Sequence, residues 1–88
     1  MFERTITVVN RAGIHARPAS LLVEKTKDFK CSIHFECGSN MINAKSILGI
    51  ITLGAAYGDK IKIIAEGEDE KDAVETLERV FLSKFEEE

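Results

Sequence analysis

The stretch that decides the fold is residues 13–37, GIHARPASLLVEKTKDFKCSIHFEC, because its buried-type residues change period halfway along. From Ala16 to about Asp28 they recur every three or four residues, which is typical of a helix that packs on one face. This stripe comprises Ala16, Ala19, Leu22, Val23, Thr26 and Phe29. From Cys31 to Cys37 every second residue is apolar, which predicts a strand with one buried face.

The same alternation marks three other segments. Residues 2–9, FERTITVV, predict a strand whose shared inward face holds Phe2, Arg4, Ile6 and Val8, with the arginine as the one polar exception. Residues 38–40 are a turn and residues 41–43 begin a returning strand, so residues 31–43 predict a hairpin. Residues 60–66, KIKIIAE, predict a fourth strand with Ile61, Ile63 and Ala65 inward.

Two more helices follow from their end signals. Ser46 is the predicted N-cap of a short helix that ends at Gly54. Asp69 is the predicted cap of a closing helix over residues 70–85. The apolar stripe of that helix is Ala73, Val74, Leu77, Val80 and Phe81. Glu86–Glu88 oppose the helix dipole, so we expect fraying there.

The resulting order, β-α-β-β-α-β-α, predicts an α+β fold. One sheet would carry the helices on one face. Its other face would be left to water, which an antiparallel sheet tolerates.

Length and charge narrow the class of protein. The 88 residues predict a single domain over residues 1–88, and the net charge of −3 argues against nucleic-acid binding. No apolar run approaches the roughly 18–20 residues of a membrane span, so we expect no membrane insertion. The first ten residues lack the pattern of a secretion signal, so the cytoplasm is the expected compartment.

Cys31 and Cys37 lie six residues apart, about 20 Å along a strand, which is too far for a disulfide. With His34 between them a metal site is conceivable. Three residues of one strand rarely converge on an ion, so we expect two reduced thiols, no metal and no cofactor.

The segment GIHARPAS, residues 13–20, places an imidazole and a guanidinium where a helix begins. Helix N-termini offer unpaired amides and partial positive charge, so they attract phosphate. Pro18 suits the first turn, and Gly13 would let the incoming loop adopt a positive φ. His15 could therefore accept a phosphoryl group that the amides and Arg17 stabilise. From spacing alone, the alternative is an exposed loop histidine beside a solvated arginine.

Two segments, GIHARPAS and NAKSILGIITLG, resemble the signature segments of the HPr family. HPr is the histidine-containing phosphocarrier protein of the bacterial phosphoenolpyruvate-dependent sugar phosphotransferase system. The resemblance extends over the whole chain, including AEGEDE at residues 65–70 and the closing helix. It implies an open-faced β-sandwich, with a four-stranded antiparallel sheet and three helices on one side.

The resemblance also implies roles for particular residues. His15 would be phosphorylated on Nδ1, with Arg17 steadying the phosphoryl group and Ser46 as a regulatory phosphorylation site. Phosphorylated enzyme I would be the donor, and the IIA domains of sugar permeases the acceptors. An HPr kinase/phosphorylase and a catabolite regulator would be further partners. The protein would be a carrier, not an enzyme that turns over alone, and a monomer is expected.

Three alternatives stay open. The chain could be a regulatory binding module in which His15 is idle. It could be a paralogous carrier of a nitrogen-linked or dihydroxyacetone kinase-linked chain. It could also be a small metal-binding protein that uses His15, His34 and the cysteines. Ser46, taken without the resemblance, is an N-cap only.

The short helix after Ser46 has two apolar sides. At about 100° per residue, Ile47, Leu48 and Ile51 share one arc, whereas Ile50 and Leu53 share another. We expect the second set to face the sheet and the first to be an exposed partner-binding patch; the alternative is that all five are buried. Ala16 and Ser20, near the start of the first helix, are included in this predicted partner-binding surface.

Overall fold

The computed structural model describes residues 1–83. Within them the chain forms the predicted elements in the predicted order. Their bounds are β1 Phe2–Thr7, α1 Ala16–Thr26, β2 Ser32–Cys37, β3 Asn40–Asn43, α2 Ile47–Leu53, β4 Lys60–Glu66 and α3 Glu70–Leu82. The fraying expected at Glu86–Glu88 lies outside the described residues.

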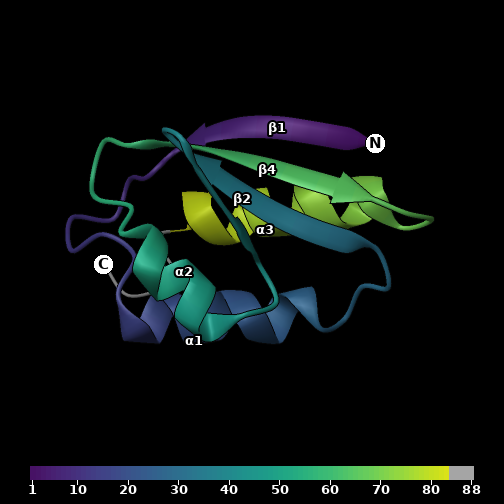
Figure 1. Cartoon of the computed structure of the whole chain (residues 1–88), viewed down its shortest axis with the longest axis horizontal. Coiled ribbons are helices and arrows are strands. Elements are labelled where there is room, and N and C mark those ends of the chain that lie inside the picture. The colour runs from purple at the N-terminus through teal and green to yellow at the C-terminus, as the bar shows by residue number, and fades with distance from the viewer. Residues whose placement is uncertain (84–88) are drawn as a thin grey trace.

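The four strands form one antiparallel sheet in the order β1-β4-β2-β3. β4 therefore lies between β1 and β2, and its register pairs Ile61 with Ile6 and Ile63 with Phe35. All three helices lie on one side of this sheet (Figure 1). The predicted open-faced α+β fold is confirmed.

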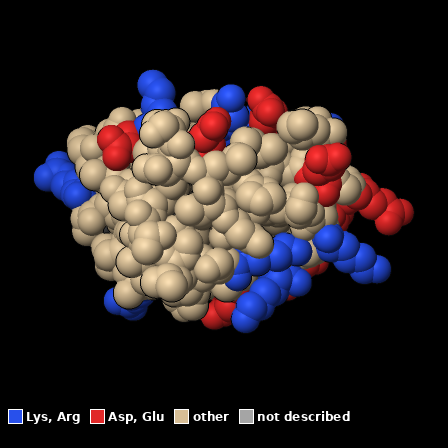
Figure 2. Space-filling model, viewed as in Figure 1, with Lys and Arg blue, Asp and Glu red and all other residues tan. Residues whose placement is uncertain are grey.

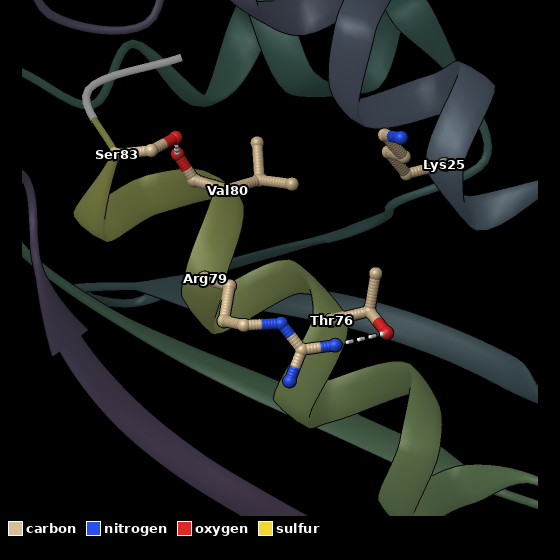
Figure 3. A pocket seen from close by; sticks show the side chains of 5 residues that line it. All are labelled: Lys25, Thr76, Arg79, Val80 and Ser83. Atoms are coloured by element: carbon tan, nitrogen blue, oxygen red, sulfur yellow. Dashed lines mark hydrogen bonds between the residues drawn. The ribbon is translucent and has the colours of Figure 1, made fainter. Parts of the chain in front are cut away.

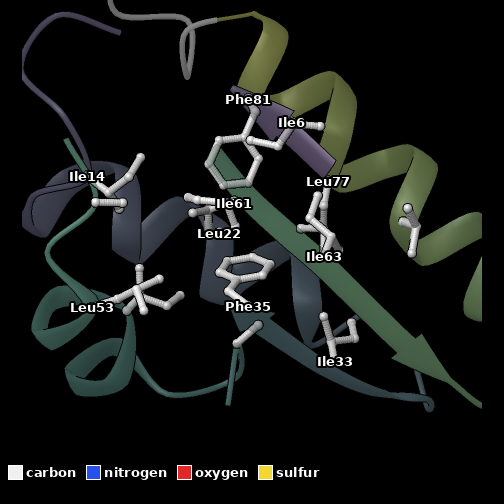
Figure 4. Packing of buried hydrophobic residues seen from close by; sticks show 14 of the residues in the cluster. Ile6, Ile14, Leu22, Ile33, Phe35, Leu53, Ile61, Ile63, Leu77 and Phe81 are labelled. Carbon is white, nitrogen blue, oxygen red and sulfur yellow. The ribbon is translucent and has the colours of Figure 1, made fainter. Parts of the chain in front are cut away.

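Strand alternation places the core between the sheet and the helices (Figure 4). Ile33, Phe35, Ile61 and Ile63 are buried in the sheet and meet apolar side chains of the helices, as the sequence pattern predicts. The rings of Phe35 and Phe81 pack edge to face, with centroids 5.8 Å apart and planes at 66°. This pair joins β2 to α3 across the layers.

Arg4 is accommodated on the inward face of β1 because it lies on an edge strand. Its guanidinium binds the Glu78 carboxylate of α3 at 2.7 Å. It also lies 5.3 Å from the centroid of the Phe2 ring. The cation thus links β1 to α3 at the border of the core.

Asp69 stands before α3 as predicted, but its side chain makes no capping bond. Its carboxylate instead accepts the backbone N–H groups of Lys30 at 2.9 Å and Cys31 at 3.0 Å. Both carboxylate oxygens are engaged with the segment before β2, so the predicted side-chain cap is wrong. None of the helices in residues 1–83 has the length and hydropathy that a membrane span requires.

Candidate functional site

His15 is the N-cap residue of α1, and its side chain is exposed. Its backbone is extended, and its carbonyl accepts the N–H of Ala19 at 3.0 Å. The imidazole itself makes no capping hydrogen bond. The backbone of His15 therefore starts the helix, while its ring does not cap it.

The loop before His15 is held against the segment that follows α2. Gly13 has a φ of +74°, and a Cβ there would lie 3.0 Å from the carbonyl oxygen of Ala55. The N–H of Ile14 donates to that same oxygen at 2.9 Å, and the Ile14 side chain is buried. Glycine is thus required at position 13 both by its backbone angle and by the close approach of another loop.

The first turn of α1 presents donors to an anion. The amides of Ala16 and Arg17 come too early in the helix to have an intrahelical acceptor. Pro18 follows in the same turn, where it has no N–H to satisfy, and is buried. Arg17 is exposed two residues from His15. The unpaired amides and the helix dipole therefore place partial positive charge at the N-terminus of α1, where His15 lies, and Arg17 adds a full charge to the same turn.

Ser46 caps α2 as predicted. Its Oγ accepts the N–H of Gly49 at 3.0 Å. Gly54 ends the helix with a φ of +67°, which suits glycine. The hydroxyl of Ser46 is half-buried at the first turn of a helix that contacts α1 and β3.

The two faces of α2 are divided as the sequence predicts. Ile50 is 1 % exposed and Leu53 9 %, whereas Ile47, Leu48 and Ile51 are 44 %, 71 % and 39 % exposed. The alternative in which all five are buried is wrong. The face of the molecule over α2 is largely free of charged side chains (Figure 2). We call Ile47, Leu48 and Ile51 the α2 patch.

Ala16 and Ser20 are exposed on α1, on the helix that contacts α2. Their exposure agrees with a place in a partner-binding surface. For Ala16 it corrects the other expectation, that this residue belongs to the buried stripe. At about 100° per residue, Ala16 falls about 60° outside the arc that Ala19, Leu22 and Thr26 define, and it begins the first turn.

A hollow of about 330 Å³ lies between the last turns of α1 and α3 (Figure 3). Its lining comprises Lys25, Thr76, Arg79, Val80 and Ser83. Lys25 is nine residues from Ala16, about 13 Å along the helix axis. The hollow is therefore separate from the site at His15.

Cys31, His34 and Cys37 do not gather into a site. Cys31 is buried just before β2, while His34 and Cys37 are half-buried within it, and both thiols are free. Burial and a hydrogen bond to Asp69 raise the pKa of Cys31 to about 11, and burial raises the pKa of Cys37. Both thiols are thus held in the protonated form, which is a poor metal ligand. Among residues 1–83 no three His, Cys, Asp or Glu side chains form a metal-binding group.

Two contributors to the site were not predicted. Asn10 lies in the segment NRAG that follows β1, where Asn three residues before Gly is a turn signal but does not indicate a role at the site. Ala55 carries no local signal at all, because only the tertiary fold brings its carbonyl to Gly13 and Ile14.

Comparisons with known proteins agree with this geometry. Residues 2–83 match the family described as PTS HPr component phosphorylation site. The chain is 42 % identical to the phosphocarrier protein HPr of Treponema pallidum (strain Nichols) over 88 residues, covering all of both chains.

Solved structures agree as well. The crystal structure of HPr-C-His from Thermoanaerobacter tengcongensis is 44 % identical, with a TM-score of 0.95 over 100 % of this chain and 99 % of that one. A structure described as an HPr dimer from the same organism is also 44 % identical. It has a TM-score of 0.77 over 97 % and 98 % of the two chains.

Fold and similarity together define a phosphocarrier protein, not an enzyme in the ordinary sense. The chain belongs to the HPr family of the phosphotransferase system.

Proposed function

We propose that this protein accepts a phosphoryl group on His15 from phosphorylated enzyme I and passes it to the IIA domains of sugar permeases. The observation that carries the proposal is the exposed imidazole at the N-cap of α1, which makes no capping bond. The ring is thus accessible to a partner, and the fold does not depend on its capping the helix.

The chemistry needs one nucleophile and a set of charge stabilisers. A lone pair of the His15 ring, on Nδ1, forms the new N–P bond while the bond from phosphorus to the donor's histidine breaks. Negative charge on the moving group meets the amides of Ala16 and Arg17 and the Arg17 guanidinium. Phosphoryl transfer depends mainly on positioning and charge stabilisation, so this small site suffices when a partner supplies the rest.

The α2 patch supplies the orientation. Two histidines must approach one phosphorus, so the two proteins need a defined contact close to the site. α2 packs against α1, and its exposed apolar side chains lie on a largely uncharged face. Ala16 and Ser20 extend this surface onto α1.

We further propose that Ser46 is a regulatory phosphorylation site for an HPr kinase/phosphorylase, read by a catabolite regulator. Its hydroxyl is at a helix N-terminus, where a phosphate would accept N–H bonds. The protein would act in the cytoplasm as a single-domain monomer. A relative is described as a dimer, so sedimentation at several concentrations tests the monomer.

The test is incubation with phosphoenolpyruvate and enzyme I, followed by intact mass measurement. The wild type should gain one phosphoryl group, which is lost in acid and kept in base. His15→Ala should fold normally and gain none. His34→Ala, which removes a half-buried histidine of β2, is the control and should still be labelled. Labelling of His15→Ala at the wild-type rate would reject the assignment. A wild type that stays unlabelled would favour the regulatory module.

A further inference from the structure

We propose that Asn10 is a positioning residue for His15, whose buried carboxamide holds the turn that presents the imidazole to the partner. Asn10 lies between β1 and the site, five residues before His15. This inference rests on the proposed function, and the test below separates the two.

Two hydrogen bonds join Asn10 to Gly13. The carboxamide Nδ2 donates to the Gly13 carbonyl, and the N–H of Gly13 donates back to the Asn10 carbonyl at 3.1 Å. The side chain and the main chain of one residue therefore close the same turn. Arg11 and Ala12 form its exposed tip.

Burial of Asn10 is not explained by core stability alone. Its side chain is 3 % exposed, yet Oδ1 finds no hydrogen-bond donor among the described residues. A buried acceptor without a partner opposes folding, so an apolar residue would suit a purely packed position better. The feature that distinguishes asparagine here is its bond to the Gly13 carbonyl.

Thr26 offers a matched comparison, since it and Asn10 are the buried polar residues of the described chain. The Thr26 hydroxyl donates to the Val23 carbonyl at 2.8 Å, within α1. It lies ten residues from Ala16, about 15 Å along the helix axis. Loss of this hydroxyl should affect the helix without affecting the turn before His15.

The turn is the link between the core and the reactive ring. Downstream of it, the carbonyl of His15 is tied to α1 through the N–H of Ala19. The Gly13–Ile14 peptide has two restraints: its N–H, that of Ile14, donates to the Ala55 oxygen, and Asn10 holds the Gly13 carbonyl. Releasing that carbonyl should let the peptide, and hence the imidazole, deviate from the line of transfer. Since Asn10 is buried, it cannot contact enzyme I, so docking should be unchanged.

The experiment measures phosphorylation by enzyme I against carrier concentration for Asn10→Ala, Asn10→Asp and Thr26→Val, together with melting temperatures. Aspartate keeps the shape of asparagine but, when ionised, cannot donate to Gly13. Both Asn10 variants should lower kcat roughly tenfold while the half-saturating concentration stays within about twofold. Thr26→Val should leave both quantities within about twofold of wild type. An Asn10→Ala protein with wild-type kcat, or with only a raised half-saturating concentration, would overturn the inference.

A second readout needs no phosphate. In ¹⁵N–¹H spectra of the unphosphorylated protein, Asn10→Ala should shift the amide signals of residues 13–17, whereas Thr26→Val should not. If wild type is not phosphorylated but these shifts occur, the proposed function fails and the turn's control of His15 stands. If wild type is phosphorylated and the signals of residues 13–17 are unchanged in Asn10→Ala, the inference on Asn10 fails alone.

Discussion

At the residue scale, His15 shows how a side chain can be well placed and still be accessible. Its backbone bonds to α1 through Ala19, and the residue before it bonds to Ala55. The fold therefore restrains the chain on both sides of the imidazole without a capping bond from the ring. A reactive group attached in this way can be replaced with little loss of stability.

Arg17 should contribute to transfer through its charge and its planar shape. We expect Arg17→Ala to slow phosphorylation by roughly tenfold or more, because a charge-assisted bond contributes on the order of 1.5–3 kcal/mol. Arg17→Lys should recover only part of the rate, since lysine lacks the planar fork. Lys25→Ala is the control, a cation lost from the same helix about 12 Å further along. Phosphorylation rates for Arg17→Ala within twofold of wild type would show that Arg17 does not stabilise the phosphoryl group during transfer.

Ser46 allows charge and capping to be separated. Aspartate is itself a good N-cap, so Ser46→Asp should keep α2 folded while adding a negative charge beside the α2 patch. The half-saturating concentration with enzyme I should then rise, because a donor carrying phosphohistidine is anionic at its own site. Ser46→Ala should lose about 1 kcal/mol of stability with its cap but dock normally. An unchanged half-saturation for Ser46→Asp would argue against electrostatic regulation.

At the element scale, the two faces of α2 should separate stability from docking. Leu53→Ala should cost about 2–5 kcal/mol of unfolding free energy, because it removes a buried side chain. Leu48→Ala should cost little stability but weaken enzyme I binding, since Leu48 is 71 % exposed. Thermal melts and binding titrations on both variants test this. A Leu48→Ala protein that melts early and binds normally would show the functional assignment of the faces to be reversed.

Asp69 links the start of α3 to the segment before β2, and this link should depend on pH. The N–H of Lys30, and then the bonds from Cys31, lower the pKa of the Asp69 carboxyl below its ordinary value. A group whose pKa is lowered by folding adds stability above its unfolded pKa and loses it as pH falls through the folded pKa.

We therefore expect Asp69→Asn to melt below wild type at neutral pH, with a difference that narrows as the pH falls below about 4. Melting temperatures measured from neutral to acidic pH on both proteins would show this. Glu70 has a pKa lowered by the Gly67 N–H, and it remains in both proteins, so it cancels in the comparison. A difference that stays constant across the range would mean that the carboxylate charge is not what holds Lys30 and Cys31.

At the scale of the whole molecule, one core joins the sheet to all three helices. A substitution at the centre of this core should therefore lower the free energy of unfolding of the whole domain. Phe81 is 1 % exposed and packs on Phe35. Phe81→Ala should cost about 3–5 kcal/mol. A chain of this length has about 4–13 kcal/mol in total.

Urea unfolding measures that loss. Leu82→Ala is the control. Leu82 is next to Phe81 in the chain but is 60 % exposed, so its replacement should change stability by no more than about 0.5 kcal/mol. Equal losses for the two variants would contradict the packing described for α3.

The sequence by itself determined the seven elements and the separation of the two faces of α2. Those features rest on residue spacing within one element, and spacing fixes which side chains share a face. It also indicated His15, Arg17 and Ser46, since Pro18 and the caps mark where helices begin.

Only the tertiary structure decided the features that depend on residues far apart in the chain. The carbonyl of Ala55 contacts Gly13 and Ile14, which are more than forty residues away in the chain. The carboxylate of Asp69 accepts the N–H groups of Lys30 and Cys31 instead of capping α3. The role of Asn10 also appeared only when its side chain was found buried against the Gly13 carbonyl. Hydrogen bonds to the main chain depend on where a backbone group lies in space and not on its side chain, so residue patterns do not predict them.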